Sequence, residues 1–381
     1  EIHERLVGSE MCIRDSCYVP VTTCTLRCHY CYITHQRLFS NKLPKFKYEA
    51  DVLKRALTQE RLGGTCMFNF CGGGETLLPP EMPSFIKAVL GNGHYVMVVT
   101  NATVSKRFDE IIGMLSAEEC SRLFFKFSFH YLELKKRKLL DKFFANINKV
   151  REAGCSFTLE ITPSDELIPY IEEVKRISLE KVGAICHCTV ARDEQDPNKM
   201  PLLTKMSKED YIKTWSQFDS DLFKYKISVF GEKRNEFCYA GDWSCYLNIG
   251  TGQMSQCYVS LYKQNIFDDV TKPINFLPIG CNCQEFHCFN AHAFLTFGDI
   301  PELESPTYDS LRNRTCLDGS EWLTPNMKEF MSHKLVESNM EYTEEHKVEV
   351  DIKLKKFKIK RKIQVSKEFL KFKIKEIIGK K

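Results

Sequence analysis

Three cysteine thiols stand close together near the start of the chain, at Cys24, Cys28 and Cys31. Thiolates at this density are ligands for iron–sulfur clusters or for zinc. A saturated 4Fe-4S cluster takes four cysteines, so three on one loop would leave one iron open to another ligand. A structural zinc site needs a fourth ligand, and no nearby residue completes such a set. The spacing therefore favours an iron–sulfur cluster with an open position over zinc.

A second motif follows, in which an apolar run at 68–71 leads into Gly72, Gly73, Gly74 and Glu75. Glycine lets the backbone approach a ligand closely, and a carboxylate pairs with an ammonium group. Taken alone, this stretch is typical of an ordinary turn. Its position after three thiols favours a binding site for a ligand that carries an amine.

The two motifs, with Tyr30 directly before the last cysteine, resemble those of the radical S-adenosylmethionine (radical SAM) superfamily. The resemblance implies that Cys24, Cys28 and Cys31 bind three irons of a 4Fe-4S cluster and that SAM binds the fourth. The SAM-binding residues that it implies are Tyr30, Gly73, Gly74, Glu75, Thr100, Asn101 and Ser128. Thr76 stands where the family often has proline, which is a minor departure.

Members of this family use the reduced cluster to cleave SAM to methionine and a 5′-deoxyadenosyl radical, which abstracts hydrogen from the substrate. The resemblance also implies an external electron donor, such as a flavodoxin or a ferredoxin. Glu160 and Thr162 are further candidates for contacts in the site. The sequence assigns no catalytic side chain.

A second group of cysteines surrounds an expected β-hairpin whose turn is at 250–252. The spacing of Cys238 and Cys257 about this turn resembles the opening of a SPASM or twitch extension, which implies one or two auxiliary 4Fe-4S clusters. The expected ligands are Cys238, Cys245, Cys257, Cys281, Cys283, Cys288 and Cys316. Later spacings are tighter than in the family, with His292 in the last place, so a zinc knuckle or unligated buried thiols stay open as alternatives.

The elements that must position these motifs alternate between short apolar runs and amphipathic stretches. Runs rich in β-branched and aromatic residues predict strands at 18–23, 66–71, 95–100, 123–129, 155–161 and 182–190. Apolar residues three or four apart predict helices at 48–61, 81–90, 105–115, 140–153 and 165–177. This alternation predicts an α/β fold of parallel βαβ units. Six units resemble the partial (β/α)6 TIM-type barrel of radical SAM enzymes, in which chemistry collects at the carboxyl ends of the strands.

We divide the chain into four parts. Residues 1–16 have no hydrophobic period and resemble a translated sequencing-adaptor fragment, so we expect an artefact there. Residues 17–230 are expected to form the radical SAM barrel. Residues 231–320 are expected to form a small Cys-rich α+β domain for the auxiliary clusters. Residues 321–381 are expected to form a helical segment and a Lys-rich tail.

The tail carries most of the positive charge. From residue 346 onward, fourteen Lys or Arg stand against four Asp or Glu in a chain of net charge +4, so the rest of the chain is acidic. An acidic body argues against nucleic acid as a partner. Alternating apolar residues at 348–354 predict an edge strand, and Ser366 is expected to cap a short helix. We favour solvated surface elements here over a dock for an anionic partner.

The chain has no run of 18 apolar residues and no secretory h-region, so we expect a cytoplasmic protein without a membrane span. Its 18 cysteines then indicate metal or cluster ligation and not a disulfide framework. SPASM-type extensions accompany peptide modification in relatives, so the resemblance implies an oxidoreductase that modifies a peptide or protein side chain. A carbohydrate or cell-envelope small molecule is the alternative substrate, and a non-catalytic iron–sulfur or zinc scaffold is the alternative to an enzyme.

Overall fold

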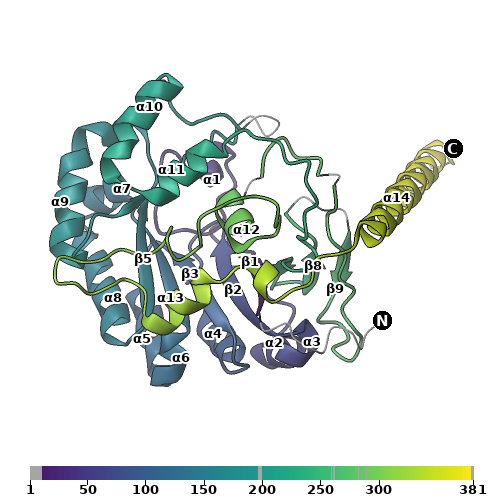
Figure 1. Ribbon diagram of the computed structural model, residues 1–381, viewed down its shortest axis with the longest axis horizontal. Coiled ribbons are helices and arrows are strands. Elements are labelled where there is room, and N and C mark those ends of the chain that lie inside the picture. The colour runs from purple at the N-terminus through teal and green to yellow at the C-terminus, as the bar shows by residue number, and fades with distance from the viewer. Residues whose placement is uncertain are drawn as a thin grey trace.

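A single nine-stranded sheet runs through the molecule, with strand order β6-β5-β4-β3-β2-β1-β7-β8-β9 (Figure 1). The computed structural model describes the backbone of residues 11–195, 200–258, 260, 262–281, 283–288 and 290–378. Strands β1 to β6 pair in parallel with their neighbours. Their bounds are β1 Met11–Val19, β2 Thr65–Gly72, β3 Tyr95–Thr100, β4 Leu123–Ser128, β5 Ser156–Ile161 and β6 His187–Cys188. The expected partial (β/α)6 barrel is thereby confirmed.

Helices connect successive strands and cover the outer face of this sheet (Figure 1). They are α1 Tyr32–His35, α2 Ala50–Ala56, α3 Gln59–Leu62, α4 Met82–Leu90, α5 Ser105–Met114, α6 Ala117–Ser121, α7 Tyr131–Lys136, α8 Leu140–Glu152 and α9 Ile171–Val182. Each longer helix buries apolar residues spaced three or four apart, as Phe108 and Ile111 of α5 show. The predicted helix at 48–61 is divided between α2 and α3.

Side chains of β4 alternate between the helices and the barrel interior, because successive residues of a strand point to opposite faces. Phe125 and Phe127 pack against Phe108 of α5, at ring distances of 5.4 and 6.1 Å. Lys126 and Ser128 reach the other face, where they line a cavity. The same strand therefore supplies both core and site.

The inner face of the barrel is filled toward the amino ends of the strands. Met67, Met97 and Phe124 form one buried cluster with Phe297 and Tyr308. Phe297 ends α12 (Ala291–Phe297), which lies in front of the strands in Figure 1. Among the described residues, the cavity of the interior lies toward the carboxyl ends of the strands.

Beyond the barrel, α10 Lys208–Trp215 and α11 Asp221–Ser228 lead to the hairpin of β7 Tyr246–Asn248 and β8 Gln253–Ser255. Antiparallel pairing of β7 and β8 confirms the hairpin predicted around 250–252, and β9 Lys263–Asn265 adds a third strand. β7 also pairs in parallel with β1, through Cys17 with Leu247 and Tyr18 with Asn248. The hairpin therefore extends the barrel sheet.

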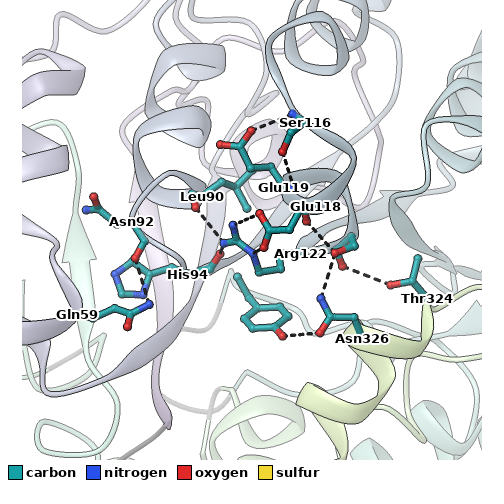
Figure 2. A network of polar contacts seen from close by, with 12 residues as sticks. Gln59, Leu90, Asn92, His94, Ser116, Glu118, Glu119, Arg122, Thr324 and Asn326 are labelled. Carbon is teal, nitrogen blue, oxygen red and sulfur yellow. Dashed lines mark hydrogen bonds and ion pairs between the residues drawn. The ribbon is translucent and has the colours of Figure 1, made fainter.

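A polar network closes the end of the barrel at which β3 and β4 begin (Figure 2). The Arg122 guanidinium donates to the carbonyl oxygens of Leu90 at 2.9 Å and His94 at 2.5 Å. Its other two nitrogens donate to the Glu118 carboxylate at 2.6 and 2.8 Å. Nearby, Ser116 and Glu119 form a capping box at the start of α6. All three Arg122 nitrogens therefore have acceptors.

The basic tail differs from the prediction. After α13 Pro325–Ser332, a single helix α14 spans Glu344–Ile378 and extends away from the sheet (Figure 1). The predicted edge strand at 348–354 is wrong. An alternating apolar pattern also contains pairs four residues apart, and Val350 and Leu354 use that spacing to bury one helix face. Lysine and glutamate, which favour helices, decide between the two readings.

Two strands also have bounds that differ from those predicted from the sequence. β1 begins at Met11 and ends at Val19, whereas the sequence predicts a strand at 18–23 and sets residues 1–16 aside. The predicted strand at 182–190 shrinks to the two residues of β6, because α9 continues to Val182 and Gly183 ends it at a φ of 80°. No helix among the described residues is long and apolar enough to cross a membrane.

Candidate functional site

The cysteine loop lies at the carboxyl end of β1 and is held by contacts from across the barrel. A backbone hydrogen bond from Cys31 to the Cys28 carbonyl oxygen, at 3.1 Å, turns the loop into α1. The Arg27 amide donates to Glu133 of α7 at 3.1 Å. Thr25 and Thr103 share a hydroxyl hydrogen bond of 2.7 Å. The loop is therefore fixed at its middle as well as at its ends.

The glycine turn after β2 is hydrogen-bonded to the strand that leads into this loop. The Gly74 amide donates to the Val21 carbonyl oxygen at 2.7 Å, and the Glu75 amide donates to that of Thr23 at 2.9 Å. A Cβ atom at Gly74 would lie 2.1 Å from the Thr23 oxygen. Only glycine allows this approach, so the turn and the cysteine loop form one unit.

The Glu75 carboxylate is buried and accepts three hydrogen bonds. The donors are the Thr100 hydroxyl at 2.6 Å, the Asn101 amide at 2.8 Å and the Leu77 amide at 3.1 Å. Desolvation nevertheless raises the pKa of Glu75, against the lowering effect of these donors. A cationic ligand beside Glu75 would supply the missing opposite charge.

Asn101 links this carboxylate to the cysteine loop. Its side-chain nitrogen donates to the Thr25 hydroxyl at 3.0 Å and to the Cys24 sulfur at 3.5 Å. Hydrogen bonds to cluster sulfurs are one way in which a protein tunes an iron–sulfur centre. In this structure Thr100 and Asn101 position Glu75 and Cys24, a role beyond the ligand contact that the sequence comparison implied.

One cavity of about 370 Å³ brings the predicted residues together. Every residue predicted for the first cluster and for SAM lines it, namely Cys24, Cys28, Tyr30, Cys31, Gly73, Gly74, Glu75, Thr100, Asn101 and Ser128. This volume lies in the range of small-molecule sites. Among the described residues, no three His, Cys, Asp or Glu side chains are arranged as metal ligands. The three thiols thus share a cavity without a preassembled geometry, and their chemistry and the open space fit a cluster with SAM beside it.

The loop thiols are protonated without a metal. Burial raises the pKa of Cys24 to about 11 and raises the pKa of Cys28 and Cys31 above their usual values. Iron would displace these protons, because metal ligation requires the thiolate.

Several cavity residues were missed by the sequence analysis. The Tyr30 hydroxyl lies 2.5 Å from Nδ1 of His130, which follows β4. Burial and then the charge of Lys126 lower the pKa of His130 to about 4, so this imidazole is neutral at pH 7. Lys126 could have been found from sequence, since it stands two residues before Ser128 on one strand face. Lys226 on α11 gave no such signal.

A buried ion cluster adjoins the cavity at β5. The Glu160 carboxylate contacts Lys126 at 2.9 Å and Arg312 at 2.6 Å. Desolvation acts to raise the pKa of Glu160, but the charges of Lys126, Arg312 and Lys226 hold it well below its usual range. Glu160 is therefore ionised at any physiological pH.

The second group of cysteines is only partly assembled. Burial, then the charge of Asp299, raises the pKa of Cys238, and the nearby thiols Cys288 and Cys257 contribute to this rise. Cys238 and Cys288 also pack against one small apolar cluster with Leu295. The structure thus places these three predicted ligands near one another.

The contacts described for the other four predicted ligands are with other parts of the chain. Cys245 is part of the barrel core, Cys281 lies near Asp351 of α14, and Cys283 lies near Glu285. Cys316 donates to the Val182 carbonyl oxygen at 3.3 Å, where α9 ends. His292 lies near the charge cluster, because burial and then the charges of Lys226 and Arg312 hold its pKa well below its usual value.

Comparisons with known proteins give two kinds of similarity. SuiB of Streptococcus suis is similar at 15% identity and a TM-score of 0.46, over 69% of this chain and 64% of SuiB, which is less than two thirds of its length. The protein anSMEcpe with bound AdoMet is similar at 16% identity and a TM-score of 0.45, over 68% of this chain and 79% of that one. BtrN in complex with AdoMet and 2-DOIA follows at 13% identity and a TM-score of 0.28, over 70% of this chain and 75% of BtrN. No curated protein sequence matches the chain.

The sequence profile of the Radical SAM superfamily matches residues 18–166. This range contains the cysteine loop, the glycine turn and strands β2 to β5. Residues 18–166 are therefore a radical SAM domain.

Proposed function

We propose that the whole chain is a radical SAM enzyme that oxidatively modifies a peptide or protein side chain. The observation that carries the first half is the single cavity shared by three loop thiols and the glycine turn. The family profile over residues 18–166 supports the same reading. The proposal of a peptide or protein substrate rests on the SPASM-like spacing of Cys238 and Cys257.

In this proposal each wall of the cavity has one task. The thiols of Cys24, Cys28 and Cys31 hold the cluster, which when bound supplies the electron that cleaves SAM. The Gly73 and Gly74 backbone and the Glu75 carboxylate take the SAM amino group, because an ammonium compensates the buried charge. Tyr30 and Ser128 take the nucleoside part. The packed inner face below the cavity excludes water from the reacting atoms.

The test is anaerobic reconstitution followed by reduction. The wild-type chain should cleave SAM to methionine and 5′-deoxyadenosine, and Cys28→Ala should abolish this cleavage. Cys66→Ala, in the core of β2, is the matched control and should retain it. A wild-type protein with full iron loading that does not bind SAM would refute the proposal.

We also propose one auxiliary 4Fe-4S cluster in the region of Cys238, Cys257 and Cys288, with a further ligand from the remaining cysteines. Replacement of Cys24, Cys28 and Cys31 together by alanine should leave about four irons per chain, since the two sites use separate ligands. Zinc in place of that iron would reassign the site to a zinc knuckle, and absence of both would leave buried structural thiols.

The substrate class is tested on the reading frames beside the gene. A peptide encoded there and co-expressed with the enzyme should lose two hydrogens. One leaves as an atom to the radical and the other as a proton, with its electron passed to an acceptor such as the auxiliary cluster. SAM-dependent consumption of a sugar nucleotide, with every neighbouring peptide unchanged in mass, would replace the peptide by a carbohydrate substrate.

A further inference from the structure

Basic side chains line part of the cavity wall. Lys126 of β4 and Lys226 of α11 reach the cavity there, beside Thr189 after β6. The Lys226 ammonium donates to the Thr189 hydroxyl at 2.5 Å. Among the residues that the structure describes, no carboxylate forms an ion pair with Lys226. Lys226 therefore keeps donors available toward the cavity.

The charges at this end do not balance. Lys126, Lys226 and Arg312 surround one carboxylate, that of Glu160, which is already shared by Lys126 and Arg312. Arg312 is fully buried, and its Nε and Nη2 atoms have no acceptor within the described part of the chain. The nearby Arg192 is paired with Glu194 at 3.2 Å, so this pair adds no net charge.

An uncompensated buried cation is costly, because desolvation removes the water that stabilises it. Proteins meet this cost by ionising less or by binding an opposite charge. The Lys226 pKa falls to about 7, since desolvation and the charges of Arg192, Lys126 and Arg312 together outweigh the attraction of Glu160. A bound anion would neutralise the excess charge at the same place.

The subsite for such an anion would centre on Lys226 and Thr189, on other strands and helices than the Glu75 turn that is expected to take the SAM amino group. Glu75 follows β2 and Glu160 lies on β5, three strand positions away in the sheet. Thr189 follows β6, at the edge of the parallel sheet farthest from β2 among β2 to β6, and Lys226 is hydrogen-bonded to it. The amino and carboxylate groups of SAM share one carbon atom and bind side by side.

We propose that Lys226 and Lys126, with the Thr189 hydroxyl, form a subsite for an anionic oxygen group of the substrate, a carboxylate or a phosphate. Arg312 supports it from behind by holding Glu160. The proposal rests on the proposed function, because it assumes that SAM fills the other end of the same cavity. It narrows the substrate to molecules that carry such a group near the carbon that loses hydrogen.

The test uses the full-length, anaerobically reconstituted chain and its melting temperature in rising succinate or inorganic phosphate, at constant ionic strength with chloride. A ligand that binds only the folded state raises the melting temperature with its concentration. The wild type should show a rise above the chloride baseline with at least one of the two anions. Lys226→Met should lose this rise. Lys224→Met is the matched control on the same helix, since that lysine is exposed and paired with Asp219 and Asp221. It should behave as the wild type does.

Succinate acting alone would identify a carboxylate subsite, and phosphate acting alone would identify a phosphate subsite. Equal rises in the wild type and in Lys226→Met, or no rise in either, would overturn the proposal. So would loss of the anion effect when SAM is saturating, because the site would then belong to the SAM carboxylate. Cleavage of SAM by the wild type is measured separately. A protein that binds the anion without cleaving SAM would refute the proposed function and leave this subsite standing.

Discussion

Two buried arginines, Arg122 and Arg312, stand at opposite ends of the barrel and are treated differently. Arg122, where β4 begins, places all three guanidinium nitrogens on acceptors from Leu90, His94 and Glu118 (Figure 2). Arg312, behind the cavity, has one such bond within the described part of the chain, to Glu160, and its guanidinium lies 4.9 Å from the centre of the Tyr308 ring. At the first end every guanidinium nitrogen has an acceptor, whereas at the second end two of the three nitrogens have none among the described residues.

We interpret Arg122 as a residue that stabilises the fold and Arg312 as a residue that supports a binding site. A satisfied polar network rigidifies the fold, and an unsatisfied one is retained only where something else completes it. Substitutions at the two ends should therefore have different consequences, and four predictions test this from the largest effect to the smallest.

The largest effect is expected for Gly74→Ala, at the open end. Its Cβ would meet the Thr23 carbonyl oxygen at 2.1 Å, so the cysteine loop has to move. A shift of about 1 Å at a reacting centre can cost about a hundredfold in rate, and we expect a loss of SAM cleavage of that order. Gly113→Ala, in α5 with no atom within 4 Å of the added Cβ, is the control. Unchanged cleavage in Gly74→Ala would show that the loop is not held by this turn.

Second, Arg122→Met should lower the free energy of unfolding by about 3 kcal/mol, because it removes two hydrogen bonds to buried carbonyl oxygens and the ion pair with Glu118. Arg312→Met should lower it by less than Arg122→Met does, since Lys126 still pairs with Glu160 and two unmet donors are removed. Urea unfolding followed by circular dichroism measures both. Equal losses would remove the distinction between the two ends.

Third, binding of succinate, whose two carboxylates are both ionised at neutral pH and above, should weaken as the pH rises above about 7. The pKa of Lys226 is about 7 without an anion, for the reasons given above, and a bound anion would raise it. Binding above pH 7 is then coupled to proton uptake, and the affinity should fall by up to about tenfold per pH unit until the bound-state pKa is reached. Below pH 7 it should be constant.

The groups that face Lys226 are Glu160, Lys126, Arg192, Arg312, Cys188 and His292. Within this range Glu160 stays ionised and His292 stays neutral, so neither produces the slope. An affinity that does not change between pH 6 and 9 would assign the binding to other groups.

The smallest effect is expected at the closed end for Ser116→Ala. This change removes the capping box of α6 and should cost about 1 kcal/mol in the free energy of unfolding. Binding of succinate or phosphate should be unaffected, in contrast to Lys226→Met. Ser310→Ala, at an exposed hydroxyl, is the control. A loss of anion binding in Ser116→Ala would show that the two ends are coupled.

Local chemistry made much of the site predictable. The cysteine loop and the turn at Gly73, Gly74 and Glu75 can each be recognised from residues that are adjacent in the sequence. The strands that precede them can be recognised from their apolar runs. The cavity then assembles because parallel strands end on the same side. Ser128 was found in the same way, as a polar residue at a strand end.

The remaining parts depend on contacts between distant segments. Lys226 and Arg312 come from helix and loop segments beyond the barrel strands, and nothing in their immediate neighbours marks them. Tyr30 was predicted, but its contact with His130 depends on how the loop after β4 returns to the cavity. In α14 the alternation of apolar residues fits a strand as well as a helix, and the packing of Val350 and Leu354 favours the helix together with the many lysines.

The place of β1 in the sheet has a consequence for biosynthesis. β1 is synthesised before its partners and pairs with β2 on one side, and among the described residues its other edge is covered by β7, through the pair of Cys17 with Leu247. Contacts so distant in sequence form late, and an uncovered strand edge invites pairing with other chains. The nascent chain therefore exposes the strand beneath its cysteine loop until residues 246–248 have left the ribosome. Early insertion of the cluster would order this end of the sheet while the chain is still growing.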